Sequence, residues 1–455
     1  MPVARGLFKS RMNPPIPLSD QLAATARTLM AVEQGRSLTE ALAKVPARLR
    51  PGAQALAFHA LRHWGEAGAL ITLLAERPPE GAARALLGLA LTLLLPQAAG
   101  GNASYAPHTV VDQSVQALAQ LRLPRGLAGF LNACLRRFLR EQEALLAQLQ
   151  QDAQARWNHP FWWVQRVRRD HPQHWQAMLA ASNRPAPMVL RVNRRHVRRD
   201  DYLAQLRAQG LLAEPVGADG IELAQAVAVE RLPGWEQGHC SVQDLAAQLA
   251  APLLLDGASL PPGARVLDAC AAPGGKTAHL LECAELELTA LDVDPQRCER
   301  IRDNLRRLGL QARVLAADAA ETPRWWDGRA FDAILLDAPC TASGIVRRHP
   351  DVRWLRRPTD IAQLAAQQLR LLEALWPTLA AGGRLLYCTC SVFKAEGDQQ
   401  IEAFLRRHAD AQLLPSPGHL MPGEAAALPG AATGHDHPGG MDGFFYALLL
   451  KRPAA

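Results

Sequence analysis

The sequence lacks an apolar run long enough to cross a membrane. Its longest run, from Ala85 to Leu95, has eleven residues and is interrupted by Thr92, whereas a bilayer span needs about 20. Residues 1–5 are not followed by an apolar segment, so we expect no secretory signal. Hydrophobic residues make up 49% of the chain and charged residues 20%, which excludes a disordered, collagen-like or coiled-coil protein. We therefore expect a globular, cytoplasmic protein without membrane association.

The cysteines show neither the spacing of a disulfide framework nor that of a metal site. The sequence contains eight: Cys134, Cys240, Cys270, Cys283, Cys298, Cys340, Cys388 and Cys390. In a chain of this length without a signal peptide, we expect no disulfide framework. Cys388 and Cys390 have no second Cys or His pair at zinc spacing, so no bound metal is expected. A chemically special cysteine in this chain is expected to be a nucleophile.

Lysine is scarce, and the basic residues are unevenly distributed. Only five of the 50 basic residues are lysines, and the net charge is +7. Residues 1–200 contain 26 Lys and Arg against 12 Asp and Glu, whereas residues 201–455 contain 24 against 31. This asymmetry indicates that the N-terminal part contacts a polyanion. Charged side chains on solvated helix faces are the alternative explanation.

The sequence pattern indicates a multidomain chain that begins with a leader and an all-α domain. A cluster of prolines prevents a helix in residues 1–17, which we expect to form a flexible leader. Residues 18–150 show apolar spacing typical of helices, including a helix over residues 129–139, and no strand signals. They predict an all-α domain.

A small α+β module is expected over residues 151–238, with a strand over residues 188–193. The module begins with aromatic residues interleaved with arginines. Such aromatics either stack on RNA bases or, more often, form a core. The residues concerned are Trp157, Phe161, Trp162, Trp163 and Trp175, among Arg166, Arg168 and Arg169.

Residues 239–455 alternate between short apolar runs and helical stretches, which is typical of an α/β, Rossmann-like, doubly wound sheet. Strands are predicted over residues 265–269, 286–292, 314–317, 331–337 and 383–389. A last strand over residues 443–450 is expected to pair antiparallel at the sheet edge, after a loop over residues 415–442.

Acidic or thiol side chains follow four of these strands, and ligands bind at the carboxyl ends of strands in such sheets. The first strand leads into a turn of small residues that lets backbone N–H groups approach a ligand. The turn fits neither the NAD fingerprint nor the nucleoside-triphosphate loop. We expect one converging site, built from the turn Cys270, Ala271, Ala272, Pro273, Gly274, Gly275 and Lys276 together with Asp292, Asp318, Asp337, Cys340 and Cys390.

These motifs resemble those of S-adenosylmethionine-dependent RNA cytosine-C5 methyltransferases. The resemblance lies in the motif over residues 268–276, in Asp-Ala-Pro-Cys over 337–340 and in Thr-Cys-Ser over 389–391. Further matches over residues 108–112 and 130–137 resemble bacterial 16S rRNA methyltransferases with an N-terminal NusB-like domain. The resemblance covers about residues 18–452 and implies S-adenosylmethionine as cofactor and 16S rRNA as partner.

The resemblance also implies a role for each site residue. Cys390 would be the nucleophile that adds to C6 of cytosine, and Cys340 would assist release of the methylated product. Asp337 would hydrogen-bond the pairing edge of the base, and Lys276 would support its polarisation. Residues 270–276 would hold the methionine end of the cofactor. Of the other carboxylates, Asp292 would bind the ribose hydroxyls, Asp318 would lie near the adenine and Asp337 near the sulfonium.

Some alternatives stay open at this point. In DNA cytosine-C5 methyltransferases the nucleophile follows a proline after the fourth strand, which would favour Cys340. The same chemistry on tRNA or another RNA fits the motifs equally well, whereas a noncatalytic RNA-binding factor would be expected to lack one of the two thiols. We expect a monomer whose RNA affinity comes from salt-dependent phosphate contacts. Arginines that border the site are candidates for these contacts, with salt bridges on helix surfaces as the alternative for each: Arg347, Arg348, Arg353, Arg356 and Arg357.

Overall fold

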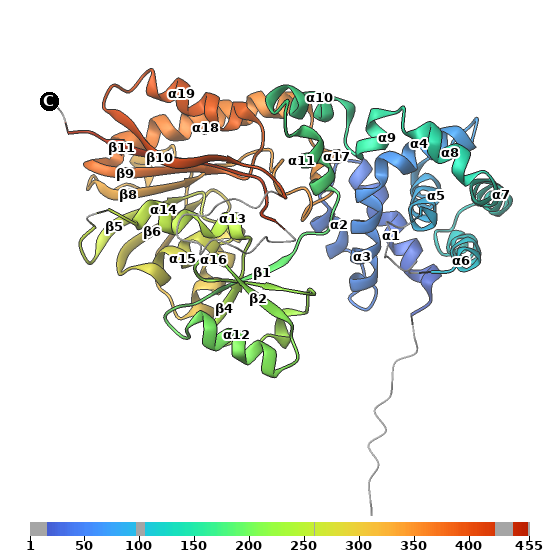
Figure 1. The fold of residues 1–455 in the computed structure, drawn as a ribbon, viewed down its shortest axis with the longest axis horizontal. Coiled ribbons are helices and arrows are strands. Elements are labelled where there is room, and N and C mark those ends of the chain that lie inside the picture. Colours follow the sequence, from blue (N-terminus) through green and yellow to red (C-terminus); the bar gives the residue numbers. More distant parts are fainter. Residues whose placement is uncertain (1–15, 97–104, 259, 424–439, 454–455) are drawn as a thin grey trace, which may run out of the picture. The chain divides into compact units, whose positions relative to one another are not determined.

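The computed structural model describes residues 16–96, 105–258, 260–423 and 440–453 (Figure 1). It divides into two compact units, Met1–His159 and Pro160–Ala455. Of the predicted leader, only Ile16 and Pro17 are among the described residues. In the part of the chain that is described, no helix is long and apolar enough to span a bilayer.

The N-terminal unit is helical in all of its described elements, as the apolar spacing predicted. Helix α5 is apolar on every side and contacts α1, α3, α4, α6 and α7, so it forms the centre of this unit. The apolar run that is too short for a membrane is thus the core helix. The elements are α1 (Leu18–Glu33), α2 (Leu38–Ala43), α3 (Arg50–Arg62), α4 (Trp64–Leu74), α5 (Gly81–Leu94), α6 (Pro107–Gln120), α7 (Leu127–Arg140), α8 (Gln142–Leu149) and α9 (Ala153–Trp157).

The second unit opens with an antiparallel sheet in the order β2-β3-β1-β4, and β1 confirms the predicted strand. Helix α12 contacts β2 and β3. The domain limits expected at residues 150 and 238 stay predictions. Strand β4 belongs to this sheet although it lies beyond residue 238, and α9 contacts α4 although it lies beyond residue 150. The elements are α10 (Phe161–Asp170), α11 (Trp175–Ser182), β1 (Met188–Val192), α12 (Arg199–Ala208), β2 (Ala213–Val216), β3 (Gly220–Leu223) and β4 (Cys240–Val242).

The larger sheet has the order β10-β11-β9-β8-β5-β6-β7. Strands β9, β8, β5, β6 and β7 run parallel, and the chain order reverses between β5 and β8. This arrangement confirms the predicted Rossmann-like fold, with its switch point beside the end of β5. The strands are β5 (Ala264–Ala269), β6 (Leu286–Asp292), β7 (Arg313–Ala316), β8 (Phe331–Asp337), β9 (Leu379–Thr389), β10 (Ala411–Leu420) and β11 (Phe444–Lys451).

Helices cover both faces of this sheet, with α14, α15 and α16 on one side and α18 and α19 on the other (Figure 1). Successive residues of β8 point to opposite faces, so Leu335 packs in one core and Leu336 in the other. The helices are α13 (Leu245–Gln248), α14 (Ala250–Leu255), α15 (Gly275–Cys283), α16 (Pro295–Leu308), α17 (Val352–Leu355), α18 (Pro358–Leu375) and α19 (Asp398–Leu405).

The last strand pairs antiparallel with β9, as expected, but it is not the edge strand. Strand β10 pairs along its outer side, so residues 415–420, predicted as loop, form part of a strand. The reason is that Phe444–Leu449 is buried on both faces, which needs a neighbour on each side. The more exposed β10 provides the edge that faces water.

Candidate active site

The predicted site residues lie at the carboxyl ends of five neighbouring strands, with Asp318 just after β7. Asp292 ends β6 and Asp337 ends β8, while the turn after β5 begins at Cys270. Cys390 directly follows β9, and Asp337 pairs in register with Cys388 of that strand. The parallel pairing therefore places the turn, the carboxylates and the thiols along one edge of the sheet.

The turn between β5 and α15 is a tight backbone structure. Cys270 has a positive φ of 66°, Gly274 one of 95°, and the Ala272–Pro273 peptide bond is cis. The Ala271 N–H donates to the Leu291 carbonyl at 2.7 Å. The turn therefore runs close to the end of β6.

The two glycines of the turn differ in the space around them. A Cβ on Gly274 would lie 3.1 Å from Ile301 Cγ2, whereas one on Gly275 would lie 3.6 Å from Gln243 Nε2. Gly274 thus needs to be glycine for its backbone conformation and its packing. Gly275 has room for a small side chain, so the fold alone does not require glycine there.

Asp292 is buried and already has partners in the protein. Its Oδ2 accepts from the Ala272 N–H at 3.2 Å and its Oδ1 from the Asp294 N–H at 3.1 Å. Arg297 Nη2 lies 3.4 Å from the same Oδ2. Asp292 thus fixes the turn to the end of β6, and the Cys270 side of the turn faces a pocket beside it.

This pocket is large enough for part of a small-molecule ligand and combines polar and apolar walls, as expected of a nucleoside site. Asp318 lies in it, where Arg370 Nη2 donates to its Oδ2 at 2.8 Å. Burial would raise the pKa of Asp318, but the hydrogen bonds from Arg370 and from the Ala320 N–H lower it. The lining is Cys270, Asp292, Val293, Arg297, Ala317, Asp318, Ala319, Pro339, Gln367 and Leu371.

Asp268 is a site residue to which the sequence pattern assigned no role, although it opens the motif of the turn. It is completely buried. Thr277 Oγ1 donates to its Oδ2 at 2.6 Å, and its Oδ1 has no hydrogen-bond partner within the described parts of the chain. Burial raises the pKa of Asp268 to about 7. A buried, unpaired carboxyl oxygen at the switch point suits a donor group of a bound ligand.

Lys276 and Asp337 form a partly buried ion pair in which Nζ donates to Oδ2 at 2.7 Å. Burial alone would lower the pKa of Lys276, but the charge and hydrogen bond of Asp337, together with other groups nearby, outweigh it and raise the pKa. The Cys388 thiol donates to the other oxygen, Oδ1, at 3.4 Å. Burial, with the Asp337 charge, raises the pKa of Cys388 well above its ordinary value. Cys388 therefore stays a neutral thiol.

The two candidate catalytic thiols lie side by side, with Cys340 Sγ 3.4 Å from Cys390 Sγ. The hydrogen bond to Cys390, together with burial, raises the pKa of Cys340 well above its ordinary value. Cys340 therefore keeps its proton at neutral pH and can donate it toward Cys390 Sγ. Either sulfur can be the donor of this hydrogen bond, so the choice of Cys390 as the attacking group rests on its Thr-Cys-Ser motif.

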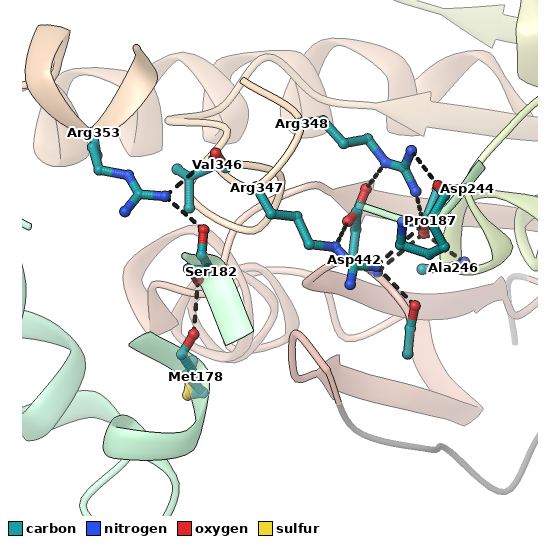
Figure 2. A network of polar contacts seen from close by, with 11 residues as sticks. Met178, Ser182, Pro187, Asp244, Ala246, Val346, Arg347, Arg348, Arg353 and Asp442 are labelled. Carbon is teal, nitrogen blue, oxygen red and sulfur yellow. Dashed lines mark hydrogen bonds and ion pairs between the residues drawn. The ribbon is translucent and has the colours of Figure 1, made fainter. Parts of the chain in front are cut away.

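Arg347 and Arg348, predicted to contact RNA phosphates, are instead tied into a buried cluster of two arginines and two aspartates (Figure 2). Arg348 donates to Asp442 Oδ2 at 2.5 Å and to Asp244 Oδ2 at 2.7 Å. Arg347 donates to Asp442 Oδ1 and, at 2.8 Å, to the Gly440 carbonyl. The sequence pattern could not show this, because the two carboxylates come from distant segments.

Arg353 is also not a surface residue. It is completely buried and donates to the Ser182 carbonyl at 2.7 Å (Figure 2). For Arg347 and Arg353, the prediction of phosphate contacts is wrong, since buried guanidinium groups are used to join segments. Arg357 remains exposed, with 73% of its side chain accessible, although it also pairs with Asp360 at 3.0 Å.

The aromatic cluster divides between core and surface. Trp163 is buried against Phe393, with ring centroids 5.1 Å apart, and Phe393 lies three residues after Cys390. Phe161 is 56% exposed. The interpretation as core therefore holds for Trp163, which supports the segment that carries Cys390.

The described cysteines are free thiols, and no group of three or more His, Cys, Asp or Glu residues in the described ranges could hold a metal ion. The basic excess of residues 1–200 is shared between the two units. Residues 1–159 contain 17 Lys and Arg against 10 Asp and Glu. In the remainder, Arg191 pairs with Glu282 in the interior, so part of that excess is structural.

Comparison with known proteins places these features in a family. A family model for the 16S rRNA methyltransferase RsmB/F matches residues 259–450, and one for the ferredoxin-like domain of RsmF/B-like methyltransferases matches residues 159–230. Two solved structures are similar. The crystal structure of PH0851 has a TM-score of 0.75 at 25% identity, covering 97% of this chain and 100% of that one. A methyltransferase homologue from Pyrococcus horikoshii has a TM-score of 0.54 at 27% identity, covering 66% and 98%.

Two curated relatives match nearly end to end, and both are named ribosomal RNA small subunit methyltransferase B. The protein of Pseudomonas syringae pv. tomato is 44% identical over 447 residues, which is 94% of this chain and 96% of that protein. The protein of Citrobacter koseri is 42% identical over 431 residues, which is 92% and 96%. The family expected from the motifs is confirmed: the chain belongs to the ribosomal RNA small subunit methyltransferase B family.

Proposed function

We propose that the protein transfers a methyl group from S-adenosylmethionine to C5 of a cytosine in 16S rRNA through a covalent Cys390–C6 intermediate. The observation that carries this proposal is the Cys340–Cys390 thiol pair at the strand end next to the Lys276–Asp337 ion pair. Both pairs are groups that a cytosine ring requires, since its C5 is too weak a nucleophile to take a methyl group unaided.

Cys390 begins the reaction by adding its sulfur to C6 of the base, which makes C5 an enamine-like nucleophile. The bound cofactor supplies an electrophilic methyl group, which moves to C5 with loss of the positive charge on its sulfur. A base then removes the C5 proton, the C5–C6 double bond forms again and the C6–sulfur bond breaks. Cys390 is released as a thiolate.

Cys340 is proposed to act in this release. Its raised pKa keeps it protonated before the reaction, when it hydrogen-bonds Cys390 and stabilises the attacking sulfur. Once Cys390 is bonded to C6, that interaction is lost, and Cys340 is the nearest thiol to the adduct. The loss of that hydrogen bond removes the largest cause of its raised pKa, so Cys340 can give up its proton to solvent, take the C5 proton and so assist the departure of Cys390.

Asp337 and Lys276 are proposed to bind the pairing edge of the base. A carboxylate can accept from the exocyclic amino group of cytosine, and an ammonium group can donate to its ring nitrogen or carbonyl. The contact from the ammonium group withdraws electrons from the ring as the thiolate adds, and the contact to the carboxylate orients the base. A base inside paired RNA has to be flipped out to reach them.

The residues of the turn fit the cofactor. Cys270 and Asp318 line the pocket at the switch point, and Asp268 offers an unpaired buried oxygen to a donor group. Each carboxylate oxygen of Asp292 accepts one hydrogen bond from a backbone N–H group. Each oxygen therefore keeps a lone pair that can accept from a ribose hydroxyl. The methionine end would lie along residues 270–276.

The substrate follows from the relatives, which are named for the small-subunit ribosomal RNA. Bisulfite sequencing of 16S rRNA from a strain lacking this protein, and from the same strain complemented with it, tests the proposal. We expect one cytosine to be protected from conversion only in the complemented strain. Loss of protection in a tRNA instead, with 16S rRNA unchanged, would support the alternative that the substrate is another RNA.

A further inference from the structure

One buried carboxylate, Glu396, lies between the two turns that carry the candidate catalytic thiols. Its Oε2 accepts from Thr341 Oγ1 at 2.5 Å and from Ser391 Oγ at 2.6 Å. Thr341 directly follows Cys340, and Ser391 directly follows Cys390. A single oxygen atom therefore links the residue after one thiol to the residue after the other.

The second oxygen strengthens the same link. Oε1 accepts from the Thr341 N–H at 2.9 Å and from Gln368 Nε2 at 3.1 Å. Gln368 Nε2 also donates to the Pro339 carbonyl at 3.0 Å, so it holds the turn on the other side of Cys340. The carboxylate thus accepts four hydrogen bonds, and all four come from groups on or around the thiol-bearing turns.

Glu396 is placed firmly enough to act in this way. It is completely buried, as are Thr341, Ser391 and Gln368. Its own carbonyl accepts from Tyr387 OH at 2.8 Å, which fixes the residue against the end of β9. A buried carboxylate without a cation is costly unless hydrogen bonds compensate it, and none of the ion pairs found among the described residues involves Glu396.

Other hydrogen bonds also hold the two turns. Thr341 Oγ1 lies 3.4 Å from Ser391 Oγ, and Arg356 Nε donates to the Thr341 carbonyl at 3.0 Å. The Gly344 N–H donates to the Cys390 carbonyl at 2.9 Å, and Ser343 Oγ lies 2.9 Å from Ser391 Oγ. Both connect the segment after Cys390 to residues 343 and 344, which lie further along the chain from Cys340. Glu396 instead bonds the residue directly after each thiol, and it bonds Thr341 through both the backbone and the side chain.

We propose that Glu396 is a positioning residue that sets the spacing of Cys340 and Cys390. The inference rests on the proposed function, since the pair has to act in sequence on one base. If the turns drift apart, Cys340 can neither donate to Cys390 before attack nor reach the C5 proton afterwards. Glu396 touches neither the base nor the cofactor.

The spacing can be measured without RNA through disulfide formation between the two thiols. One thiol attacks dithiodipyridine, forms a mixed disulfide with half of the reagent and releases one thiopyridone. The second thiol then attacks this mixed disulfide, which closes the Cys340–Cys390 bond and releases the second thiopyridone. Two thiols are thereby oxidised, and one reagent molecule is reduced to two thiopyridones. Because the sulfurs are 3.4 Å apart, the wild-type protein should close the Cys340–Cys390 bond rapidly. Mass spectrometry of the linked peptides gives the rate.

The rate of disulfide closure should fall with the number of Glu396 hydrogen bonds that a substitution removes. Glu396→Ala should reduce the rate by about tenfold or more, because all four hydrogen bonds disappear. Glu396→Gln should restore most of it, since the amide has the same shape and the two hydroxyls can turn to accept. The same order is expected for the yield of methylated RNA, while the cofactor affinity should stay unchanged.

Partner variants keep the test decisive where Glu396→Ala does not fold. Thr341→Val and Ser391→Ala each remove one hydroxyl from the carboxylate, and each should slow closure by about threefold. Thr378→Val is the matched control. Its hydroxyl is also buried and donates to the Leu375 carbonyl at 2.7 Å, but it lies before β9, at the opposite edge of the sheet. This control should close at the wild-type rate.

Wild-type closure rates and methylation yields in folded Glu396→Ala, or in both partner variants, would overturn the proposal. Equal slowing in Thr378→Val would also overturn it, because the effect would then reflect general loosening. A Cys340→Ala variant that forms no RNA adduct would instead remove the proposed function. The disulfide rates would still decide whether Glu396 holds the two turns together.

Discussion

The sulfur of Cys340 lies 3.4 Å from that of Cys390, although 49 residues separate them in the chain. The pair exists because β8 and β9 are parallel neighbours whose ends are in register. We propose different roles for the two thiols, in which Cys390 attacks the base and Cys340 assists release. The hydrogen bond between them, together with burial, raises the pKa of Cys340.

These roles predict different failures for the two cysteine variants. Cys340→Ala should still attack the base and take up the methyl group, but release should stall and leave a covalent adduct. Cys390→Ala and the double variant should form none. Denaturing electrophoresis of the protein with labelled substrate RNA reads this out. Cys388→Ala, whose thiol hydrogen-bonds Asp337, should show at most a mild defect. An adduct in Cys390→Ala alone would invert the assignment.

The two glycines of the cofactor turn should fail in different ways. Gly274→Ala forces a side chain into a left-handed backbone conformation and against Ile301, which should destabilise the fold by about 1 kcal/mol or more. Gly275→Val should leave the fold nearly intact but weaken cofactor binding by about tenfold. Calorimetric titration and thermal denaturation separate the two effects. Normal cofactor affinity in Gly275→Val would place the turn outside the site.

Asp268 should make stability depend on pH. Burial raises its pKa from 3.8 to about 7, so between these values the folded state binds more protons than the unfolded one. Stability therefore falls as pH rises through this window, by at most about 1.4 kcal/mol per pH unit. Asp268→Asn lacks this term, so its advantage over wild type should grow between pH 5 and 7. Urea unfolding at several pH values tests this, and parallel curves would show an ordinary carboxyl.

Breaking the buried cluster of Arg347 and Asp442 should be costly. Arg347→Met leaves Asp442 with less compensation, and loss of one partner of a buried pair costs about 3–5 kcal/mol. Arg306→Met is the control, because its pair with Asp303 lies in solvent and contributes little. Urea denaturation followed by tryptophan fluorescence measures both. An equal, small effect in the two variants would mean that the cluster does not hold the fold.

Exposed arginines of the N-terminal unit should contribute to RNA affinity through phosphates. Arg140 ends α7 and has 68% of its side chain accessible. Arg140→Gln should weaken binding to all RNA sequences alike and reduce the salt slope by about one. Filter binding of the full-length protein across a salt series measures this. Arg324→Gln, equally exposed in the second unit, is the control, and equal effects would argue against a special role of the helical unit.

Much of the fold could be predicted because it depends on local patterns. The helical spacing around Leu22 and Leu29, the five parallel strands and the turn of small residues follow directly from residue type. The position of β10 outside the last strand could not be predicted, since nothing in residues 411–420 resembles a strand: they contain two prolines and a glycine. Only the need of the buried β11 for a second neighbour places them in the sheet.

The sequence by itself determined the family, the order of the domains and the identity of the groups that could react. The tertiary structure decided what surrounds each group. It buried Arg347 among carboxylates from distant segments and placed Glu396 between the two turns that carry the thiols. It also left one oxygen of Asp268 without a hydrogen-bond partner among the residues that the structure describes. The physical reason is that charge, proton affinity and reach depend on burial and on neighbours across the fold, whereas residue type and spacing describe only neighbours along the chain.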